Sequence, residues 1–140
     1  MPLLPSRKAW DQIWSELALS IAERSVSLRL QVGAVIVSVD NSSVLALGYN
    51  GLEVGGANAV DSERPGGEGT IHAEINALIK LPYTHQQSRK MYVTHSPCIV
   101  CARAIVNAKI DEVIAINMYR DSSGLDLLNQ RGVNAYLLSE

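Results

Sequence analysis

The chain has 140 residues, a length that suits one domain with its own hydrophobic core, so we expect a single domain over residues 1–140. Its net charge of −2 provides no strong basic field, and we therefore expect no nucleic-acid partner. No apolar run reaches the ~20 residues of a membrane span, and no basic-then-apolar leader opens the chain. We expect a soluble, cytoplasmic protein without a membrane partner, and two cysteines at metal spacing fit that reducing compartment.

The first third of the chain predicts one helix followed by a hairpin. A helix is expected over residues 7–25, because apolar residues recur there at steps of three and four. Residues 32–39 are rich in β-branched side chains, which favours a buried strand. Residues 40–43 have the composition of a turn, and residues 44–49 predict the returning strand. The two strands should therefore pair as an antiparallel hairpin.

A glycine-rich stretch without periodicity covers residues 50–69. Loops of this length inside a compact domain tend to be functional or mobile. It leads directly into the helix expected at residues 71–80, so we expect it to close over whatever site that helix carries.

The rest of the chain alternates between helix and strand. Helices are predicted over residues 71–80, 97–108 and 122–131, the last ending at Gly132. Strands are predicted over residues 91–94, 111–116 and 133–138. We expect the helix at 71–80 to bury its large aliphatic residues, Ile71, Ile75, Leu78 and Ile79. Strand–helix–strand crossovers imply a parallel portion of sheet with helices on both faces, and thus an α/β fold.

Two short motifs carry the chemistry. The first is His72-Ala73-Glu74, and the second is Pro97-Cys98-Ile99-Val100-Cys101. Together they match the pattern H-x-E followed by P-C-x-x-C, which is typical of zinc-dependent deaminases.

The residue types in these motifs suit a catalytic zinc ion. His72, Cys98 and Cys101 supply three ligands, and the chain has no further cysteine, so a closed site of four cysteines cannot form within it. Cys98 and Cys101 should lie one turn apart on one helix face. Pro97 fits the start of that helix, where the macrodipole favours a thiolate.

Glu74 is predicted to be the proton carrier and not a ligand. A metal lowers the pKa of bound water towards ~7, and a carboxylate beside that water can take its proton and pass it to the substrate. A C-x-x-C pair alone would also fit a redox pair or half of a structural zinc site, but the upstream H-x-E and Pro97 favour the catalytic interpretation. His85 is expected in a surface loop, and His95 either at the pocket border or in a structural role at a strand end.

Longer stretches around these motifs resemble deoxycytidylate (dCMP) deaminases of the cytidine deaminase superfamily, in particular the small phage and bacterial forms. The matching segments are Val32–Val37 (VGAVIV), Gly48–Gly51 (GYNG), His72–Leu78 (HAEINAL) and Tyr92–Cys98 (YVTHSPC) with Cys101. Asn76 and Ser96 discriminate in favour of this family, because transfer-RNA adenosine deaminases typically carry methionine and glutamate at those places. The resemblance implies a three-layer α/β/α fold with a five-strand mixed sheet, zinc as cofactor, and hydrolysis of dCMP to dUMP with release of ammonia.

The resemblance also implies roles for residues outside the metal motif. Asn50 would bind the deoxyribose, and backbone amides around Ala73 and Cys98 would orient the ring. Arg29 and the pair Tyr119-Arg120 would lie near the phosphate, with Ser96 at the substrate pocket. A fork-shaped guanidinium suits phosphate, although Arg120 or Arg64 taken singly fits a solvated surface arginine equally well. The family forms homo-oligomers, so a dimer or hexamer is expected.

The sequence departs from the family in two places. Regulated members often carry Cys or His ligands for a second zinc ion in the long loop, whereas residues 52–70 contain neither, so we expect no second zinc and no nucleotide control of that type. Ser27 stands where a cysteine is frequent, and only a packing consequence is expected. Deamination of dCTP, a 5-modified dCMP, a nucleoside, a base or RNA remains an alternative, as does a silent zinc protein.

Overall fold

The computed structural model describes residues 7–27, 29–55, 70–82, 87–119 and 121–138. Four helices and five strands alternate along the described chain. In order they are α1 (Trp10–Ala22), β1 (Gly33–Ser38), β2 (Val44–Tyr49), α2 (Ala73–Leu78), β3 (Arg89–His95), α3 (Ile99–Asn107), β4 (Glu112–Asn117), α4 (Ser123–Gln130) and β5 (Asn134–Leu137). Each element predicted from the sequence is present, with ends that shift by a few residues.

The five strands form one mixed sheet in the order β2-β1-β3-β4-β5. β1 pairs antiparallel with β2, as the hairpin prediction required, and also antiparallel with β3. The β3–β4 and β4–β5 pairs are parallel, joined by the crossover helices α3 and α4. The predicted five-strand mixed sheet is therefore confirmed.

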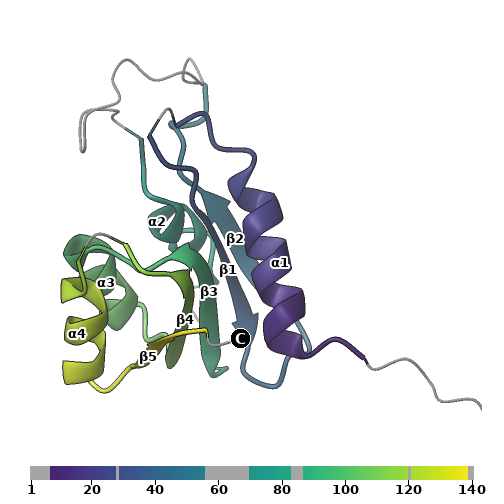
Figure 1. The fold of residues 1–140 in the computed structure, drawn as a ribbon, viewed down its shortest axis with the longest axis vertical. Helices are drawn as coiled ribbons and strands as arrows, with labels where there is room; N and C mark the ends of the chain where they lie inside the picture. The colour runs from purple at the N-terminus through teal and green to yellow at the C-terminus, as the bar shows by residue number, and fades with distance from the viewer. Residues whose placement is uncertain (1–6, 28, 56–69, 83–86, 120, 139–140) are drawn as a thin grey trace, which may run out of the picture.

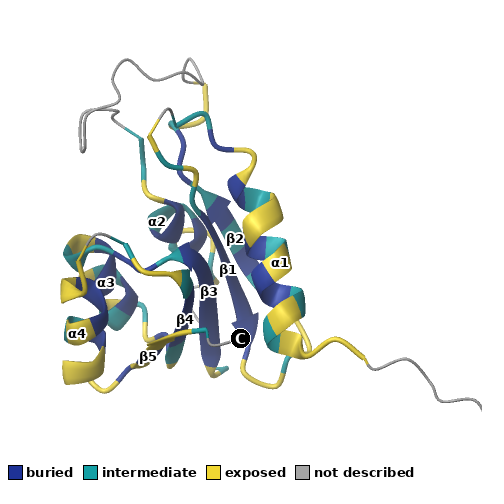
Figure 2. Cartoon of the chain, in the orientation of Figure 1, coloured by how far each residue is buried: buried dark blue, intermediate teal, exposed yellow. Residues whose placement is uncertain are grey.

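Helices cover both faces of this sheet (Figure 1). α1 packs on one face, where Trp14 and Ala18 join a buried cluster with Val35, Val37 and Tyr92. The other face is covered by α2, α3 and α4, and its larger cluster includes Ile36, Met91, Ile105, Val113 and Leu128. Figure 2 shows the strands buried between these two helical layers. The three-layer α/β/α arrangement is confirmed.

Two side-chain hydrogen bonds fasten α1 to its face of the sheet. The Tyr92 hydroxyl, on β3, donates to the Asp11 carboxylate, and Trp14 Nε1 donates to Asn41 Oδ1 at 2.9 Å. Asn41 lies in the β1–β2 turn, so the amphipathic helix is tied to both a central strand and a hairpin tip. Among the described residues, no helix is long and apolar enough to cross a membrane.

The buried side of α2 differs from the prediction. Ala73, Glu74 and Ala77 are the buried residues, whereas Ile79 is 71% exposed and Ile71 and Ile75 are only partly covered. The physical reason lies in β2. A Cβ at Gly48 would come within 2.7 Å of Ala73 O and 2.6 Å of Ala77 N, so the helix backbone sits directly on the strand and only small side chains fit between them.

Replacing Gly48 tests this close approach. We expect Gly48→Ala to lower the free energy of unfolding by about 1–3 kcal/mol, because the new methyl group overlaps the α2 backbone, which cannot rotate away. Gly51→Ala is the matched control, since its Cβ would meet only the Tyr49 ring edge at 3.3 Å. Denaturant unfolding of both variants gives the comparison, and equal stability losses would contradict the proposed packing constraint.

Candidate active site

The segment that carries His72 is held by hydrogen bonds on both sides of this residue. Gly51 and Ile71 exchange two backbone hydrogen bonds, at 3.1 and 2.8 Å, which hold the chain before α2 against the end of β2. Asn76 Nδ2 then donates to Tyr49 O at 2.8 Å from within α2. His72 takes the extended N-cap position of the helix, so its ring and the Glu74 side chain project from the first turn.

The segment that carries the cysteines follows β3. Cys98 has extended dihedral angles (φ −72°, ψ 171°) and is the N-cap of α3, while Cys101 lies in the first turn. The prediction placed both cysteines inside the helix, which is wrong for Cys98, because the chain turns into helical geometry only after it. The N-cap position still directs its sulfur towards Cys101 and His72.

The three predicted ligands meet at one point. His72 Nδ1 lies 3.1 Å from Cys101 Sγ and 3.5 Å from Cys98 Sγ, and the three ligand atoms are within 4.8 Å of one another. A tetrahedral zinc ion with bonds of ~2.0–2.3 Å needs neighbouring ligand atoms roughly 3.5 Å apart. The donor set and its spacing therefore fit zinc, with His72 exposed, Cys98 half-buried and Cys101 buried.

The protonation of these ligands is shared among them. The pKa of the Cys98 thiol falls to about 3, because Cys101 and then His72 donate hydrogen bonds to its sulfur. The pKa of Cys101 is raised, since it is the donor in that pair and is itself buried. The hydrogen bond to Cys98 also raises the pKa of His72. One thiolate is thus formed in advance, and binding of a cation would displace the remaining protons.

Glu74 is buried beside this group, with 4% of its surface exposed. Burial raises the pKa of its carboxyl to about 7, because the charged form loses its solvation. A group with this pKa can take up and release a proton near neutral pH, which is what the predicted proton carrier must do.

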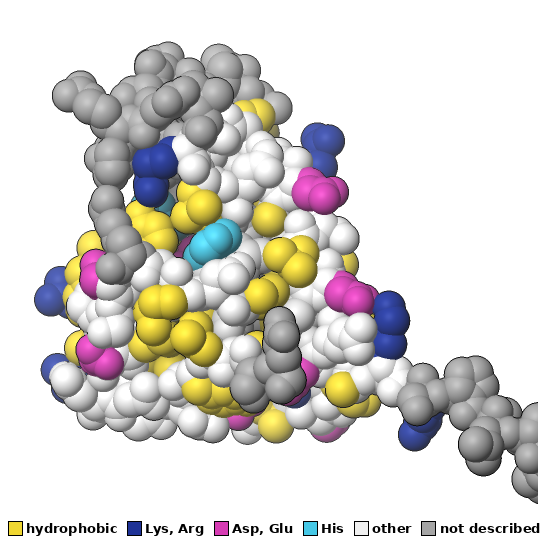
Figure 3. All heavy atoms as spheres, in the orientation of Figure 1, with side chains coloured by type: hydrophobic (Ala, Val, Ile, Leu, Met, Phe, Trp, Pro, Cys, Tyr) yellow, Lys and Arg dark blue, Asp and Glu magenta, His cyan; other side chains and the backbone are white. Residues whose placement is uncertain are grey.

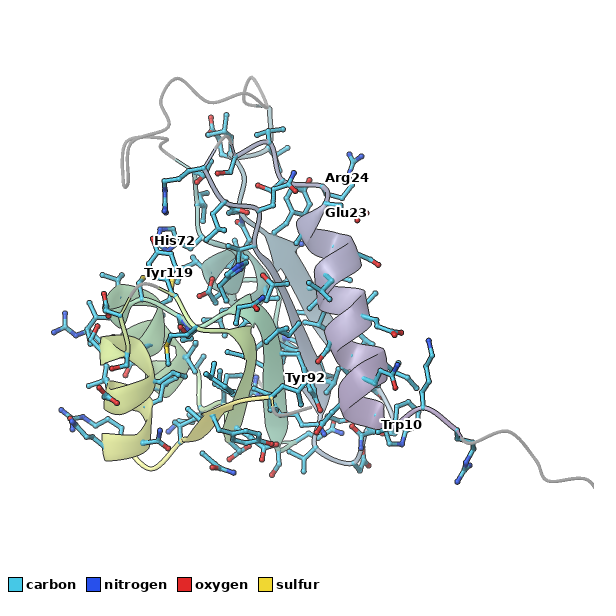
Figure 4. All side chains as sticks on the ribbon, viewed as in Figure 1. Trp10, Glu23, Arg24, His72, Tyr92 and Tyr119 are labelled. Atoms are coloured by element: carbon cyan, nitrogen blue, oxygen red, sulfur yellow. The ribbon has the colours of Figure 1, made fainter. Side chains whose placement is uncertain are left out.

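One pocket joins these residues to the predicted substrate contacts. His72, Ala73, Glu74 and Cys98 line it, and so do Arg29, Asn50, Ser96 and Tyr119. His72 and Tyr119, both labelled in Figure 4, line this pocket together. The face of the molecule in this view is drawn with all its atoms in Figure 3. Arg120, Arg64, His85 and residues 56–69 of the loop lie outside the described residues.

The comparisons with known proteins agree with this geometry. The family model described as "Cytidine and deoxycytidylate deaminase zinc-binding region" matches residues 8–117. The chain is 34% identical over 140 residues to ComE operon protein 2 of Bacillus subtilis, covering 91% of this chain and 70% of that protein. It is 34% identical over 122 residues to the deoxycytidylate deaminase of Homo sapiens, covering 81% and 68% of the two chains.

A solved structure gives the same result. The crystal structure of dCMP deaminase from the cyanophage S-TIM5 in complex with dCMP and dUMP superposes with a TM-score of 0.78 at 33% identity. The match covers 91% of this chain and 95% of that one. The chain belongs to the cytidine and deoxycytidylate deaminase family.

In this deaminase the Asn50 side chain already has partners. Its Oδ1 accepts a hydrogen bond from Val32 N–H at 2.9 Å, and its Nδ2 donates to Leu30 O at 2.8 Å. Asn50 therefore fixes the segment that enters β1 and lines the pocket. An amide group carries two hydrogens, so the predicted contact with a sugar would use the other one.

Ser27 and His95 are further pocket residues of the deaminase. The sequence predicts only a packing role for Ser27, and for His95 either the pocket border or a structural role at a strand end. Ser27 lines the pocket, and its hydroxyl accepts the backbone N–H groups of Arg29 at 3.2 Å and Leu30 at 3.0 Å, which is more than the packing role expected. The sequence could have indicated this role, because Ser27 lies two residues before Arg29, a predicted phosphate contact. His95 both ends β3 and lines the pocket, with Nδ1 3.0 Å from Thr94 Oγ1, and burial lowers its pKa.

Gly124 offers a test of how the deaminase positions Cys98. A Cβ at this position, in α4, would lie 1.9 Å from Pro97 O, so Gly124→Ala should push Pro97 and Cys98 away from His72. We expect a loss of zinc affinity of roughly tenfold or more, as for other changes that misorient a ligand. Chelator competition measures it, with the exposed Gln130→Ala on the same helix as control. Unchanged affinity in a folded Gly124→Ala variant would contradict this role.

Proposed function

We propose that this chain catalyses the hydrolytic deamination of dCMP to dUMP with release of ammonia. One observation carries the proposal: a buried carboxylate, Glu74, shares a pocket with two ligands of a three-residue metal set and with a cationic side chain, Arg29. A deaminase of a nucleoside monophosphate needs these three functions, namely an activated water, a proton carrier and an anion contact. The names of the human and cyanophage relatives support the same substrate.

We infer that His72, Cys98 and Cys101 hold a zinc ion, since their donor atoms and spacing fit one. Bound there, zinc would supply the activation of water at neutral pH. The chain offers two thiols and one imidazole for this set, and two of the three residues, His72 and Cys98, line the pocket.

Glu74 then moves the protons. Its carboxylate takes a proton from the attacking water and delivers it to N3 of the cytosine ring, while the water oxygen bonds to C4. In a second transfer Glu74 takes the remaining proton from the oxygen on C4 and gives it to the amino group, the C4–N4 bond breaks, and ammonia leaves. The oxygen remains on C4 as the carbonyl of dUMP. A carboxyl whose pKa is near 7 can serve as base and then as acid in one cycle.

Arg29 and Tyr119 are proposed to meet the phosphate. Arg29 Nη2 donates to the Tyr119 hydroxyl at 2.8 Å, and its guanidinium carbon lies 5.7 Å from the ring centroid. The two side chains come from segments 90 residues apart and stand together at the pocket that contains His72. An arginine held in this way presents a planar set of donors, which suits a phosphate better than a neutral sugar.

The assembly and location remain proposals. We infer a cytoplasmic enzyme from its two unpaired thiols. We also infer a homo-oligomer, a dimer or hexamer, with Trp10 (50% exposed) and Val100 of α3 (63% exposed) on the surfaces available for contact. Light scattering after size exclusion measures the oligomeric state.

The substrate is tested by ammonia release from zinc-loaded protein with dCMP, CMP, dCTP, deoxycytidine, 5-methyl-dCMP and guanine. We expect the highest kcat/KM with dCMP. Glu74→Gln should keep its zinc but lose activity by ~10²-fold or more, because the amide cannot carry the proton. A preference for another compound would overturn the substrate, and loss of zinc in Glu74→Gln would overturn the role of Glu74.

The phosphate contact is tested with Arg29→Ala. Loss of a charge-assisted hydrogen bond should raise KM for dCMP about 10- to 100-fold and leave KM for deoxycytidine nearly unchanged. Arg103→Ala, an exposed arginine of α3 outside this pocket, is the matched control. Equal effects of Arg29→Ala on both substrates would remove the phosphate role.

A further inference from the structure

Ser96 connects the cysteine segment to the segment that follows β4. It lies between the end of β3 and Pro97, two positions before Cys98, and is only 3% exposed. Its hydroxyl oxygen accepts the Tyr119 backbone N–H at 2.6 Å, and its own backbone N–H donates to Asn117 O at 2.8 Å. One residue therefore holds both the last residue of β4 and the chain just after it.

The Ser96 hydroxyl is occupied by these protein contacts. Its hydrogen points to Met118 Sδ at 3.5 Å, while its oxygen receives the Tyr119 N–H. A serine hydroxyl has one hydrogen and two lone pairs, so its contacts with Met118 and Tyr119 use most of its capacity. These contacts show that the Ser96 hydroxyl holds the neighbouring backbone at Tyr119 in place.

The backbone ordered by Ser96 carries the side chain that holds Arg29. The Tyr119 hydroxyl accepts a hydrogen bond from Arg29 Nη2 at 2.8 Å, and the ring faces the guanidinium. An arginine side chain has ~2 kcal/mol of rotamer entropy to lose, so a partner that restrains it in advance lowers the cost of binding an anion. The order of contacts is Ser96 to Tyr119 to Arg29.

We propose that Ser96 is a positioning residue for phosphate selection: it fixes the Tyr119 backbone and, through the Tyr119 hydroxyl, the Arg29 guanidinium. The inference rests on the proposed function, in which Arg29 and Tyr119 meet the phosphate. Ser96 thereby acts through these two residues and not through a substrate contact of its own hydroxyl. Because Cys98 follows Ser96 by two residues, one short segment supports both the proposed metal end and the proposed phosphate end of the pocket.

The test compares Ser96→Ala with Ser96→Thr on dCMP and deoxycytidine. Loss of the hydrogen bond to Tyr119 should raise KM for dCMP by about tenfold, with kcat changed by less than about twofold. The effect on deoxycytidine should be much smaller, and Ser96→Thr, which keeps a hydroxyl, should restore most of the loss. Equal losses on both substrates, or no rescue by threonine, would overturn the proposal.

A double-mutant cycle separates positioning from direct contact. In the Arg29→Ala background, Ser96→Ala should add little, because the group it positions is gone; independent, additive effects would overturn the proposal. Tyr119→Phe is a second variant, which leaves Ser96 intact. It should raise KM for dCMP specifically, and this effect should disappear in the Arg29→Ala background. If Tyr119→Phe affected deoxycytidine and dCMP equally, Tyr119 would not be positioning a phosphate contact, and the proposal would be overturned.

The wild-type protein distinguishes this inference from the proposed function. Its ratio of kcat/KM for dCMP to that for deoxycytidine tests the phosphate-dependent activity itself. The change of that ratio in Ser96→Ala tests the positioning role alone. Zinc content and thermal unfolding, measured on each variant, show whether a loss comes from the metal site or from the fold.

Discussion

The three residues proposed to bind zinc come from two chain segments that meet because two helices approach neighbouring backbone with no side chain in between. α2 rests on β2 at Gly48, and α4 rests on the carbonyl of Pro97 at Gly124. The first contact sets the height of His72 over the sheet, and the second fixes the turn that ends in Cys98. A tetrahedral site tolerates only about ±0.2 Å in its bond lengths, so these two approaches decide whether the three donors match one ion.

The same close packing gives Glu74 its chemistry. Small residues on the inner side of α2 let its first turn lie against the sheet, which removes the Glu74 carboxyl from water. A carboxylate that loses its solvation becomes easier to protonate, and its pKa rises to about 7. A single packing feature therefore places His72 and raises the pKa of Glu74, two residues later. On the proposed function, stability and catalysis depend on the same contact.

The elements and the cluster of His72, Cys98 and Cys101 were predictable because their signals are local. Periodicity marked the helices, β-branched composition marked the strands, and the two motifs contained His72, Glu74, Cys98 and Cys101 in short runs. The predicted buried face of α2 failed at Ile79 because the pattern of large residues along the helix says nothing about a glycine on a strand far away in sequence. Cys98 was assigned to the helix because spacing alone does not distinguish an N-cap from the first turn.

The substrate end of the pocket depends on contacts that no short window of sequence contains. Arg29 and Tyr119 are 90 residues apart, and Ser96, just after β3, contacts Tyr119, just after β4. β3 and β4 are parallel neighbours whose carboxyl ends lie at one edge, where His95 faces Asn117. The start of β1, which follows Arg29, lies at the same edge because β1 is antiparallel to β3. The cluster of His72, Cys98 and Cys101 is thus encoded in two motifs, whereas the proposed phosphate end of the pocket depends on the sheet order. On the proposed function, changes in the residues after β3 and β4 would alter the choice of substrate while the metal-binding set and Glu74 stay in place.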